Sequence, residues 1–353
     1  MKLISDYSLL TIRHMTDFKS YIAALASGAP LARDEAKAAF TLIFQGEATP
    51  GQLGAFLMGL RLRGETIDEI IGAAQAMRAV MTPVEAPPGA IDIVGTGGDG
   101  AGTYNISTLA AIIAAAAGAI VAKHGGKAAS SLSGASDVLA ELGVKVGISP
   151  SAAAASLREA GICFMAGTAH HPAMRHAAAV RRELGVRTIF NLLGPLCNPA
   201  GVERQTIGVF SREWLEPLAH ALRELGSTRV WLLHGSDGLD EATTTGVTHV
   251  VALEDGVISA FDVSPEDAGL PRATTQQLVG GDSAHNARAL RAVLNGEKNA
   301  YRDIAALNAG VALVVAGRAA NLRDGVALAE AALDSGAARD KLDALIRCSN
   351  TAV

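Results

Sequence analysis

The feature that most constrains the fold is a short apolar run that leads directly into a glycine-rich loop. Ile91–Val94 has the composition of a buried strand, and Gly95–Gly100 follows it before a helix that we expect from about Ser107. The arrangement returns when a second apolar run, Ala119–Ala122, leads into the glycines of His124–Gly126. Strands that alternate with helices in this way predict an α/β domain with a central, mostly parallel sheet.

A small helical domain is predicted ahead of this α/β domain. Thr49 and Thr66 are each followed three residues later by Gln or Glu, which is the capping-box pattern of a helix start. Gly46 and Gly64 are typical helix-ending residues. In the first 83 residues we therefore predict helices over Asp34–Gln45, Pro50–Gly64 and Thr66–Met81.

The remaining chain continues the α/β pattern with one interruption. Residues 170–199 add no obvious strand, so they either return to the helical domain or cover a site. Further helices follow up to the C-terminal tail, Cys348–Val353, which we expect to fray. The later strands are predicted at Thr206–Phe210 and Val230–His234, with a hairpin of Val247–Leu253 and Val257–Val263.

Charge and cysteine content argue against several classes of protein. Lys and Arg number 30 and Asp and Glu 35, so the net charge of −5 disfavours a nucleic-acid binder that relies on a basic surface. Cys163, Cys197 and Cys348 have neither a disulfide-framework spacing nor a zinc spacing, which favours a reducing cytoplasm. The N-terminus has no long apolar run, so we expect neither a signal peptide nor a membrane span.

The loop Gly95–Gly100 formally matches the dinucleotide-binding pattern G-x-G-x-x-G after a strand. That interpretation fails at the next strand, which ends at Lys123 and not at the acidic residue that would bind a ribose. Asp99 would also repel a bare pyrophosphate unless a cation lay between them. The loop is therefore predicted to hold a metal-bound diphosphate through its unobstructed N–H groups. The alternative is an ordinary strand–turn–helix loop.

Hydroxyl, amine and carboxylate groups follow the predicted strands. Ser107 and Thr108 either cap a helix or bind magnesium or phosphate as hard oxygen ligands. Lys123 ends an apolar strand, which favours a second phosphate contact over a solvated surface charge. The adjacent carboxylates of Asp240 and Glu241 suit a cation that keeps several waters, or they form a polar loop.

A cluster of histidines and arginines lies in the interrupting segment. His170, His171 and His176 match no HExxH or Cys–His pattern, so we interpret them as non-ligands. Arg181 is a candidate fork for a carboxylate. Because there is no Ser–His–Asp set and no cysteine nucleophile, we expect a site that holds phosphates and metal without a covalent catalytic residue.

Taken in order, these motifs closely resemble the anthranilate phosphoribosyltransferase family of tryptophan biosynthesis. The resemblance runs from about Ala32 to Leu345. It implies transfer of a phosphoribosyl group from phosphoribosyl pyrophosphate (PRPP) to the amine of anthranilate, with Mg²⁺. The matching segments are Asp92–Gly100 (DIVGTGGDG), Asn105–Thr108 (NIST), Lys123–Gly125 (KHG), Ser130–Asp137 (SSLSGASD), His171–His176 (HPAMRH), Gly185–Pro199 (GVRTIFNLLGPLCNP) and Asp237–Glu241 (DGLDE).

The resemblance also implies a domain organisation. Residues 1–83 with 170–199 would form the small helical domain, which would mediate a homodimer. Residues 84–169 with 200–353 would form the α/β domain that binds PRPP. Such an enzyme would act on small molecules in the cytoplasm and would need neither nucleic acid nor a membrane.

Site residues follow from the resemblance by position. Magnesium would be held by Ser107, Asp240 and Glu241, and anthranilate would be bound by Gly95, Gly126 and Arg181. The residues that would bind PRPP are Gly95, Gly98, Asp99, Thr103, Asn105, Ile106, Ser107, Thr108, Lys123, His124, Gly125, Gly126, Lys127, Ala128, Ala129, Ser130, Ser131 and Ala135.

Two positions depart from the family pattern. Gly126 replaces the Asn of KHGN, which contacts anthranilate, and Leu132 replaces the Lys of SSKSG. We therefore expect weaker acceptor binding. Two other functions compete with this one: a pyrimidine nucleoside phosphorylase, which shares the fold, and a non-enzymatic relative that binds nucleic acid. The DGLDE carboxylates and the GTGGD loop disfavour the first, and the net charge of −5 disfavours the second.

Overall fold

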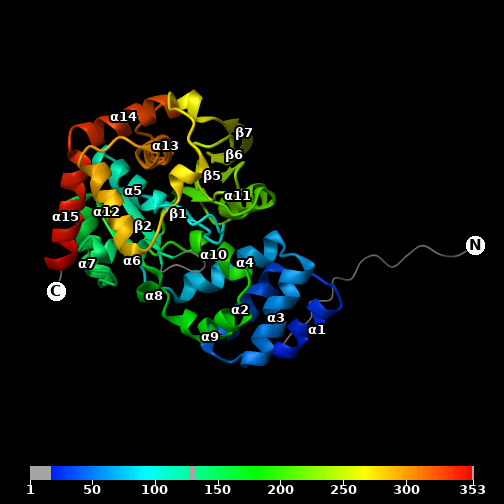
Figure 1. Ribbon diagram of the computed structural model, residues 1–353. Helices are drawn as coiled ribbons and strands as arrows, with labels where there is room; N and C mark the ends of the chain where they lie inside the picture. Colours follow the sequence, from blue (N-terminus) through cyan, green and yellow to red (C-terminus); the bar gives the residue numbers. More distant parts are fainter. Residues whose placement is uncertain (1–16, 127–131, 352–353) are drawn as a thin grey trace, which may run out of the picture.

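The computed structural model describes residues 17–126 and 132–351 (Figure 1). Within these ranges, seven strands form one sheet in the order β3-β2-β1-β4-β5-β6-β7. In this order, the first five strands run parallel to one another. Strand β6 pairs antiparallel with β5, and β7 pairs antiparallel with β6. The predicted α/β class with a mostly parallel sheet is therefore confirmed. The strands are β1 (Ile91–Gly95), β2 (Val121–Gly125), β3 (Ile162–Ala166), β4 (Arg204–Gly208), β5 (Arg229–Gly235), β6 (Thr248–Glu254) and β7 (Val257–Val263).

The predicted hairpin is confirmed as β6 and β7, and its turn shows why it forms. Asp255 and Gly256 occupy the two turn positions with φ angles of 48° and 85°. A two-residue turn between twisted strands requires positive φ at both positions, which an Asp-Gly pair tolerates.

Strand β3 is missing from the predicted elements. All its residues are buried, so it lacks the polar alternation that identifies a half-exposed strand. The expected strands at Thr206–Phe210 and Ala119–Ala122 are β4 and β2, displaced by about two residues. Their limits follow from register, because Ile91 of β1 pairs with Val121 on one side and with Arg204 on the other.

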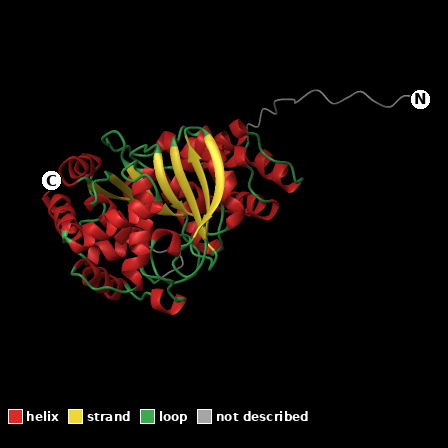
Figure 2. Ribbon diagram, turned by 90° about the horizontal axis from the view of Figure 1, so that it is seen from above, coloured by secondary structure: helices red, strands yellow, loops and turns green. Residues whose placement is uncertain are grey.

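Helices cover both faces of the sheet (Figure 2). Alternate residues of β3 face opposite layers: Ile162 and Phe164 pack into the core beneath α5 and α13, whereas Cys163 and Met165 pack against α7. The helices of the α/β part are α5 (Ile106–Ala116), α6 (Ala135–Glu141), α7 (Pro150–Ala160), α11 (Leu215–Glu224), α12 (Ser283–Leu294), α13 (Ala300–Val315), α14 (Leu322–Asp334) and α15 (Ala337–Thr351).

The expectation that the tail frays from Cys348 is wrong for Cys348–Thr351, and residues 352 and 353 lie outside the described residues. Helix α15 continues to Thr351, because Ser349 is buried and its hydroxyl accepts a hydrogen bond from the Lys145 N–H at 3.0 Å. Across the two described ranges, no helix combines the length and apolarity that crossing a membrane would require.

A helical bundle lies beside the sheet, and two later helices join its N-terminal members (Figure 1). The predicted helices are confirmed as α2, α3 and α4, with ends within one residue. Phe40 and Phe56 share one buried core with Val180 of α9 and Phe190 of α10. The bundle consists of α1 (Phe18–Ala26), α2 (Arg33–Gln45), α3 (Pro50–Arg63) and α4 (Ile67–Val80), together with α9 (Arg175–Leu184) and α10 (Ile189–Leu196).

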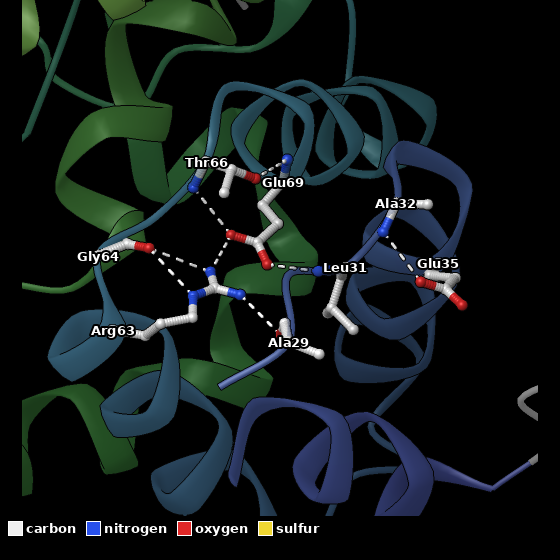
Figure 3. A network of polar contacts seen from close by, with 8 residues as sticks. All are labelled: Ala29, Leu31, Ala32, Glu35, Arg63, Gly64, Thr66 and Glu69. Atoms are coloured by element: carbon white, nitrogen blue, oxygen red, sulfur yellow. Dashed lines mark hydrogen bonds and ion pairs between the residues drawn. The ribbon is translucent and has the colours of Figure 1, made fainter. Parts of the chain in front are cut away.

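A buried carboxylate ties the loops of this bundle together (Figure 3). Glu69, in the first turn of α4, is fully buried and accepts hydrogen bonds from the N–H groups of Leu31 and Thr66, each at 2.8 Å. It also forms an ion pair with Arg63, which donates to the Ala29 carbonyl at 3.0 Å. One ion pair therefore links the α1–α2 connection to the α3–α4 connection.

Candidate active site

The candidate site lies where the parallel strands end. The chain leaves β1 between β2 and β4, which is where the strand order reverses, and sheets of this kind leave a ligand crevice at such a point. A cavity of about 280 Å³, called here the polar cavity, occupies this position. Its lining is contributed by Val94–Asp99, Gly102–Ser107, Lys123–Gly126, Ser133–Ala135 and Asp240–Glu241.

The loop after β1 is anchored so that several of its amides stay available. The Thr96 N–H donates to the Gly208 carbonyl at 2.8 Å, and the Gly97 N–H donates to Oδ2 of Asp240 at 2.7 Å. Within the described residues, the N–H groups of residues 98–100 donate no hydrogen bond. Such unpaired amides in a glycine loop are ready donors for an anion.

Three carboxylates lie at this loop. Oδ2 of Asp99 accepts from the Asp240 N–H at 3.5 Å, and Oε1 of Glu241 accepts from the Ser107 N–H at 3.2 Å. Burial, together with repulsion from Asp99 and from Glu241, raises the pKa of Asp240 well above its usual range. Burial and Asp99 raise the pKa of Glu241 to about 7, against the opposing effect of Lys123. A divalent cation would relieve this accumulation of negative charge.

The donors at this position fit Mg²⁺. Carboxylate and hydroxyl oxygens are its preferred ligands, and the ion commonly keeps waters or takes phosphate oxygens of a substrate. Over residues 17–126 and 132–351, no three His, Cys, Asp or Glu side chains are arranged to hold a metal ion alone. Ser107, Asp240 and Glu241 all line the polar cavity, so they offer an incomplete shell of the kind that Mg²⁺ accepts.

Lys123 enters the polar cavity from β2 and is only 4% exposed. Its Nζ donates to the Ile93 carbonyl at 2.5 Å. Desolvation lowers its pKa, while Asp92, Glu241 and Asp240 act in the opposite direction. Because an ammonium group has three donors, this buried cation keeps N–H groups for a further acceptor.

A second cavity of about 310 Å³, called here the apolar cavity, adjoins the first. The two share Val94–Thr96 and His124–Gly126. The Arg181 guanidinium lies 5.0 Å over the Phe190 ring, and desolvation lowers its pKa. A planar apolar ring that carries a carboxylate would suit such surroundings. The other lining side chains include Met77, His171, Met174 and Asn191.

Two histidines stand together at the boundary of the cavities. The His124 and His171 rings are 5.0 Å apart. Burial and the neighbouring histidines lower the pKa of His124 to about 3 and that of His171 to about 4. Both rings are therefore neutral at pH 7, so they add no positive charge to this boundary.

Comparisons with known proteins agree on one family. Residues 87–339 match the model described as "Glycosyl transferase family, a/b domain", and residues 19–81 match "Glycosyl transferase family, helical bundle domain". Anthranilate phosphoribosyltransferase of Methylocella silvestris is 64% identical over 96% of this chain and 97% of its own length. That of Rhodopseudomonas palustris is 60% identical over 96% of this chain and 100% of its own length.

The chain belongs to the anthranilate phosphoribosyltransferase family.

Solved structures of the family have the same fold. The crystal structure of anthranilate phosphoribosyltransferase from Thermus thermophilus matches with a TM-score of 0.88 at 43% identity, and covers 94% of this chain and 99% of that one. The Saccharomyces cerevisiae protein in complex with PRPP and Mg matches with a TM-score of 0.87 at 30% identity, over 95% of this chain and 98% of that one.

The structure brings together most of the residues that the family resemblance implies. Thr108 is the exception among those described, because its side chain is buried away from the lining of the polar cavity. Lys127, Ala128, Ala129, Ser130 and Ser131 lie outside the described residues. The implied PRPP residues that do line the polar cavity are Gly95, Gly98, Asp99, Thr103, Asn105, Ile106, Ser107, Lys123, His124, Gly125, Gly126 and Ala135.

The implied anthranilate residues have a different distribution. Gly95 and Gly126 line both cavities, whereas Arg181 lines only the apolar one. A Cβ at Gly95 would lie 2.5 Å from Oδ2 of Asp240, so a side chain at this position would have to displace that carboxylate. Among the residues that the structure describes, none would lie within 4 Å of a Cβ at Gly126. The other departure from the family pattern, Leu132, is 82% exposed.

Sequence reasoning missed several contributors. Arg187 donates to the Gly98 carbonyl at 2.6 Å and stacks 4.5 Å over the Phe210 ring, so it holds the glycine loop from the helical side. His171 and Met77 line the apolar cavity although the sequence did not assign them to it. Arg187 lies within a family motif, but its partners are distant in sequence, and local patterns carry no sign of them.

Proposed function

We propose that this family member transfers the 5-phosphoribosyl group from PRPP to the amine of anthranilate, releasing pyrophosphate and N-(5-phosphoribosyl)anthranilate in tryptophan biosynthesis. The observation that carries the proposal is the pair of adjoining cavities. One cavity combines free amides, a lysine and carboxylates, and the other combines apolar side chains with Arg181. The first suits a diphosphate with its cation, and the second suits an aromatic carboxylate.

In this proposal the polar cavity binds PRPP. Lys123 and the N–H groups of residues 98–100 contact its phosphates, and Ser107, Asp240 and Glu241 hold Mg²⁺. When bound, the ion would supply positive charge that stabilises the departing pyrophosphate. The yeast relative solved with PRPP and Mg supports this assignment.

The apolar cavity binds anthranilate with its carboxylate at Arg181, as a charge-assisted fork. The ring packs among Met77, Met174 and Phe190. A yeast relative solved with 4-fluoroanthranilate, at 26% identity and a TM-score of 0.86, supports an aromatic ligand. The amine would then face the boundary at His124–Gly126, which both cavities share.

The reaction needs positioning more than acid–base chemistry. The bond between C1 of the ribose and the pyrophosphate oxygen breaks with oxocarbenium character, and the neutral amine of anthranilate supplies the electron pair of the new C1–N bond. The nitrogen then loses one proton, which the released pyrophosphate accepts. The loop amides stabilise the negative charge that develops on pyrophosphate, and no side chain forms a covalent intermediate.

The domain assignment remains part of the proposal. Residues 1–83 with 170–199 would form the small domain and residues 84–169 with 200–353 the PRPP-binding domain. We propose that the small domain also forms the homodimer contact, because Leu62 and Val186 on its surface are 80% and 52% exposed. A cytoplasmic location agrees with Cys163, Cys197 and Cys348, which are free.

A fluorescence assay tests this function. Anthranilate fluorescence should fall when PRPP and Mg²⁺ are both present and should stay constant when either is omitted. Purified protein that leaves anthranilate unchanged but cleaves pyrimidine nucleosides with phosphate would show that the alternative enzyme class is correct. A protein that does neither but binds nucleic acid would show that the chain is a non-enzymatic relative.

A further inference from the structure

We propose that Asn286 is a positioning residue for the polar cavity, and that it acts by fixing the side-chain orientation of Asn105. Asn286 lies in the first turn of α12 and does not line the polar cavity itself. Its amide contacts Asn105, which does. The inference rests on the proposed function in one respect, namely that PRPP occupies the polar cavity.

The polarity of the hydrogen bonds determines which way each amide points. The Gly281 backbone N–H can only donate, and it donates to Oδ1 of Asn286 at 2.8 Å. Nδ2 of Asn286 must therefore face Asn105, where it donates to Oδ1 at 2.9 Å. Nδ2 of Asn105 is then left to donate to the Ser133 carbonyl at 3.3 Å. A backbone N–H outside the site thus orients an amide inside it.

The chain of hydrogen bonds is buried and reinforced. Asn286 is 1% exposed, so water cannot readily replace a lost partner. Tyr301 donates its hydroxyl to the Asn105 carbonyl at 3.1 Å, and its ring stacks 4.5 Å from that of Tyr104. Asn105 is therefore held through both its side chain and its backbone, from α12 and α13 respectively.

The orientation matters because Asn105 occupies the N-cap of α5 without capping it. Its side chain makes no cap hydrogen bond and bridges instead to the Ser133 carbonyl, in another segment that lines the polar cavity. This leaves the first turn of α5 open toward the cavity, where the Ser107 N–H meets Glu241. If the Asn105 amide rotated, it would place an oxygen against the Ser133 carbonyl, and the bridge would be lost.

The experiment measures PRPP affinity by calorimetry with Mg²⁺ in variants of the full chain. Asn286→Leu keeps the side-chain volume and removes both hydrogen bonds, and Asn286→Ser is a milder change if the first variant is unstable. Each is made in the wild-type chain and in an Asn105→Ala background. Ser156→Ala is the control, because it removes another buried hydrogen bond, from Oγ to the Ile162 carbonyl at 2.7 Å, in α7.

We expect Asn286→Leu to weaken PRPP binding about threefold to tenfold in the wild-type chain, in line with the loss of one internal hydrogen bond. In the Asn105→Ala background the same change should weaken binding less than about twofold, because the residue through which it acts is gone. The KM for PRPP should rise while the KM for anthranilate stays constant. Ser156→Ala should lower the thermal midpoint without changing PRPP affinity.

Three results from the variants would overturn the inference. Equal losses in both backgrounds would show that Asn286 does not act through Asn105. If Ser156→Ala lost as much PRPP affinity as Asn286→Leu, the loss in Asn286→Leu would be explained by general destabilisation of the fold. Unchanged PRPP affinity in both Asn286 variants would remove the role altogether. A wild-type chain that binds no PRPP would refute the proposed function first, and the inference with it.

Discussion

Replacing Gly126 by Asn should tighten anthranilate binding. The backbone at Gly126 is outside the left-handed region, and a Cβ there would meet no atom of the described residues within 4 Å. A side chain here therefore needs no left-handed backbone and displaces none of the described residues. Gly126 lines both cavities, so an amide at this position would stand where anthranilate is proposed to meet PRPP.

The expected magnitude follows from one added hydrogen bond. A neutral hydrogen bond contributes about 0.5–1.5 kcal/mol, which corresponds to roughly threefold to tenfold in affinity. The charge-assisted contact of Arg181 is the stronger one and is already present, so the gain should not exceed this range. PRPP affinity should stay constant, because the added amide does not replace the free amides of residues 98–100.

The assay measures the anthranilate KM by fluorescence at saturating PRPP and the PRPP affinity by calorimetry. Gly126→Ala is the matched control, since it adds the Cβ without the amide. Equal anthranilate affinity in the Asn and Ala variants would refute the reasoning. So would a wild-type chain that prefers a substituted aminobenzoate, because the space at Gly126 would then serve a different acceptor.

Three further predictions test the metal, the loop and the bundle. The double variant Asp240→Ala, Glu241→Ala should lose several kcal/mol of transition-state stabilisation, seen as a lower turnover number, while the fold survives. Full activity of this variant at limiting Mg²⁺ would contradict the metal assignment. Gly98→Val should weaken PRPP binding more than about tenfold, because Gly98 has a φ of 83° and a Cβ would lie 3.4 Å from Arg187; unchanged calorimetric affinity would exclude its contact with PRPP. Glu69→Ala should lower the free energy of unfolding by about 3–5 kcal/mol, since it leaves the buried N–H groups of Leu31 and Thr66 and the Arg63 guanidinium without their acceptor. Glu35→Ala is the control, because the half-buried Glu35 accepts a hydrogen bond from the Ala32 N–H at 2.9 Å (Figure 3). It should cost about 1 kcal/mol in urea unfolding, and equal losses in the two variants would show that burial of Glu69 adds nothing.

Local chemistry in the sequence was enough to predict most helix ends and the site motifs. Thr49 and Thr66 form the capping boxes that their sequences indicate, with Gln52 and Glu69 at the third helical position. The Asp255-Gly256 turn and the glycine loop after β1 also depend on residues adjacent in sequence. Such features are predictable because both interacting groups lie within one turn of the chain.

The tertiary structure alone decided the contacts between distant segments. Strand β3 is recognisable only once helices cover both of its faces, and the limits of β2 and β4 come from pairing with Ile91. Arg187 contacts Gly98 across 89 residues, and Asn286 contacts Asn105 across 181. No sequence pattern identifies such partners in advance. Their contacts are stabilised by burial and by matching of hydrogen-bond donors with acceptors, and both arise only in the assembled fold.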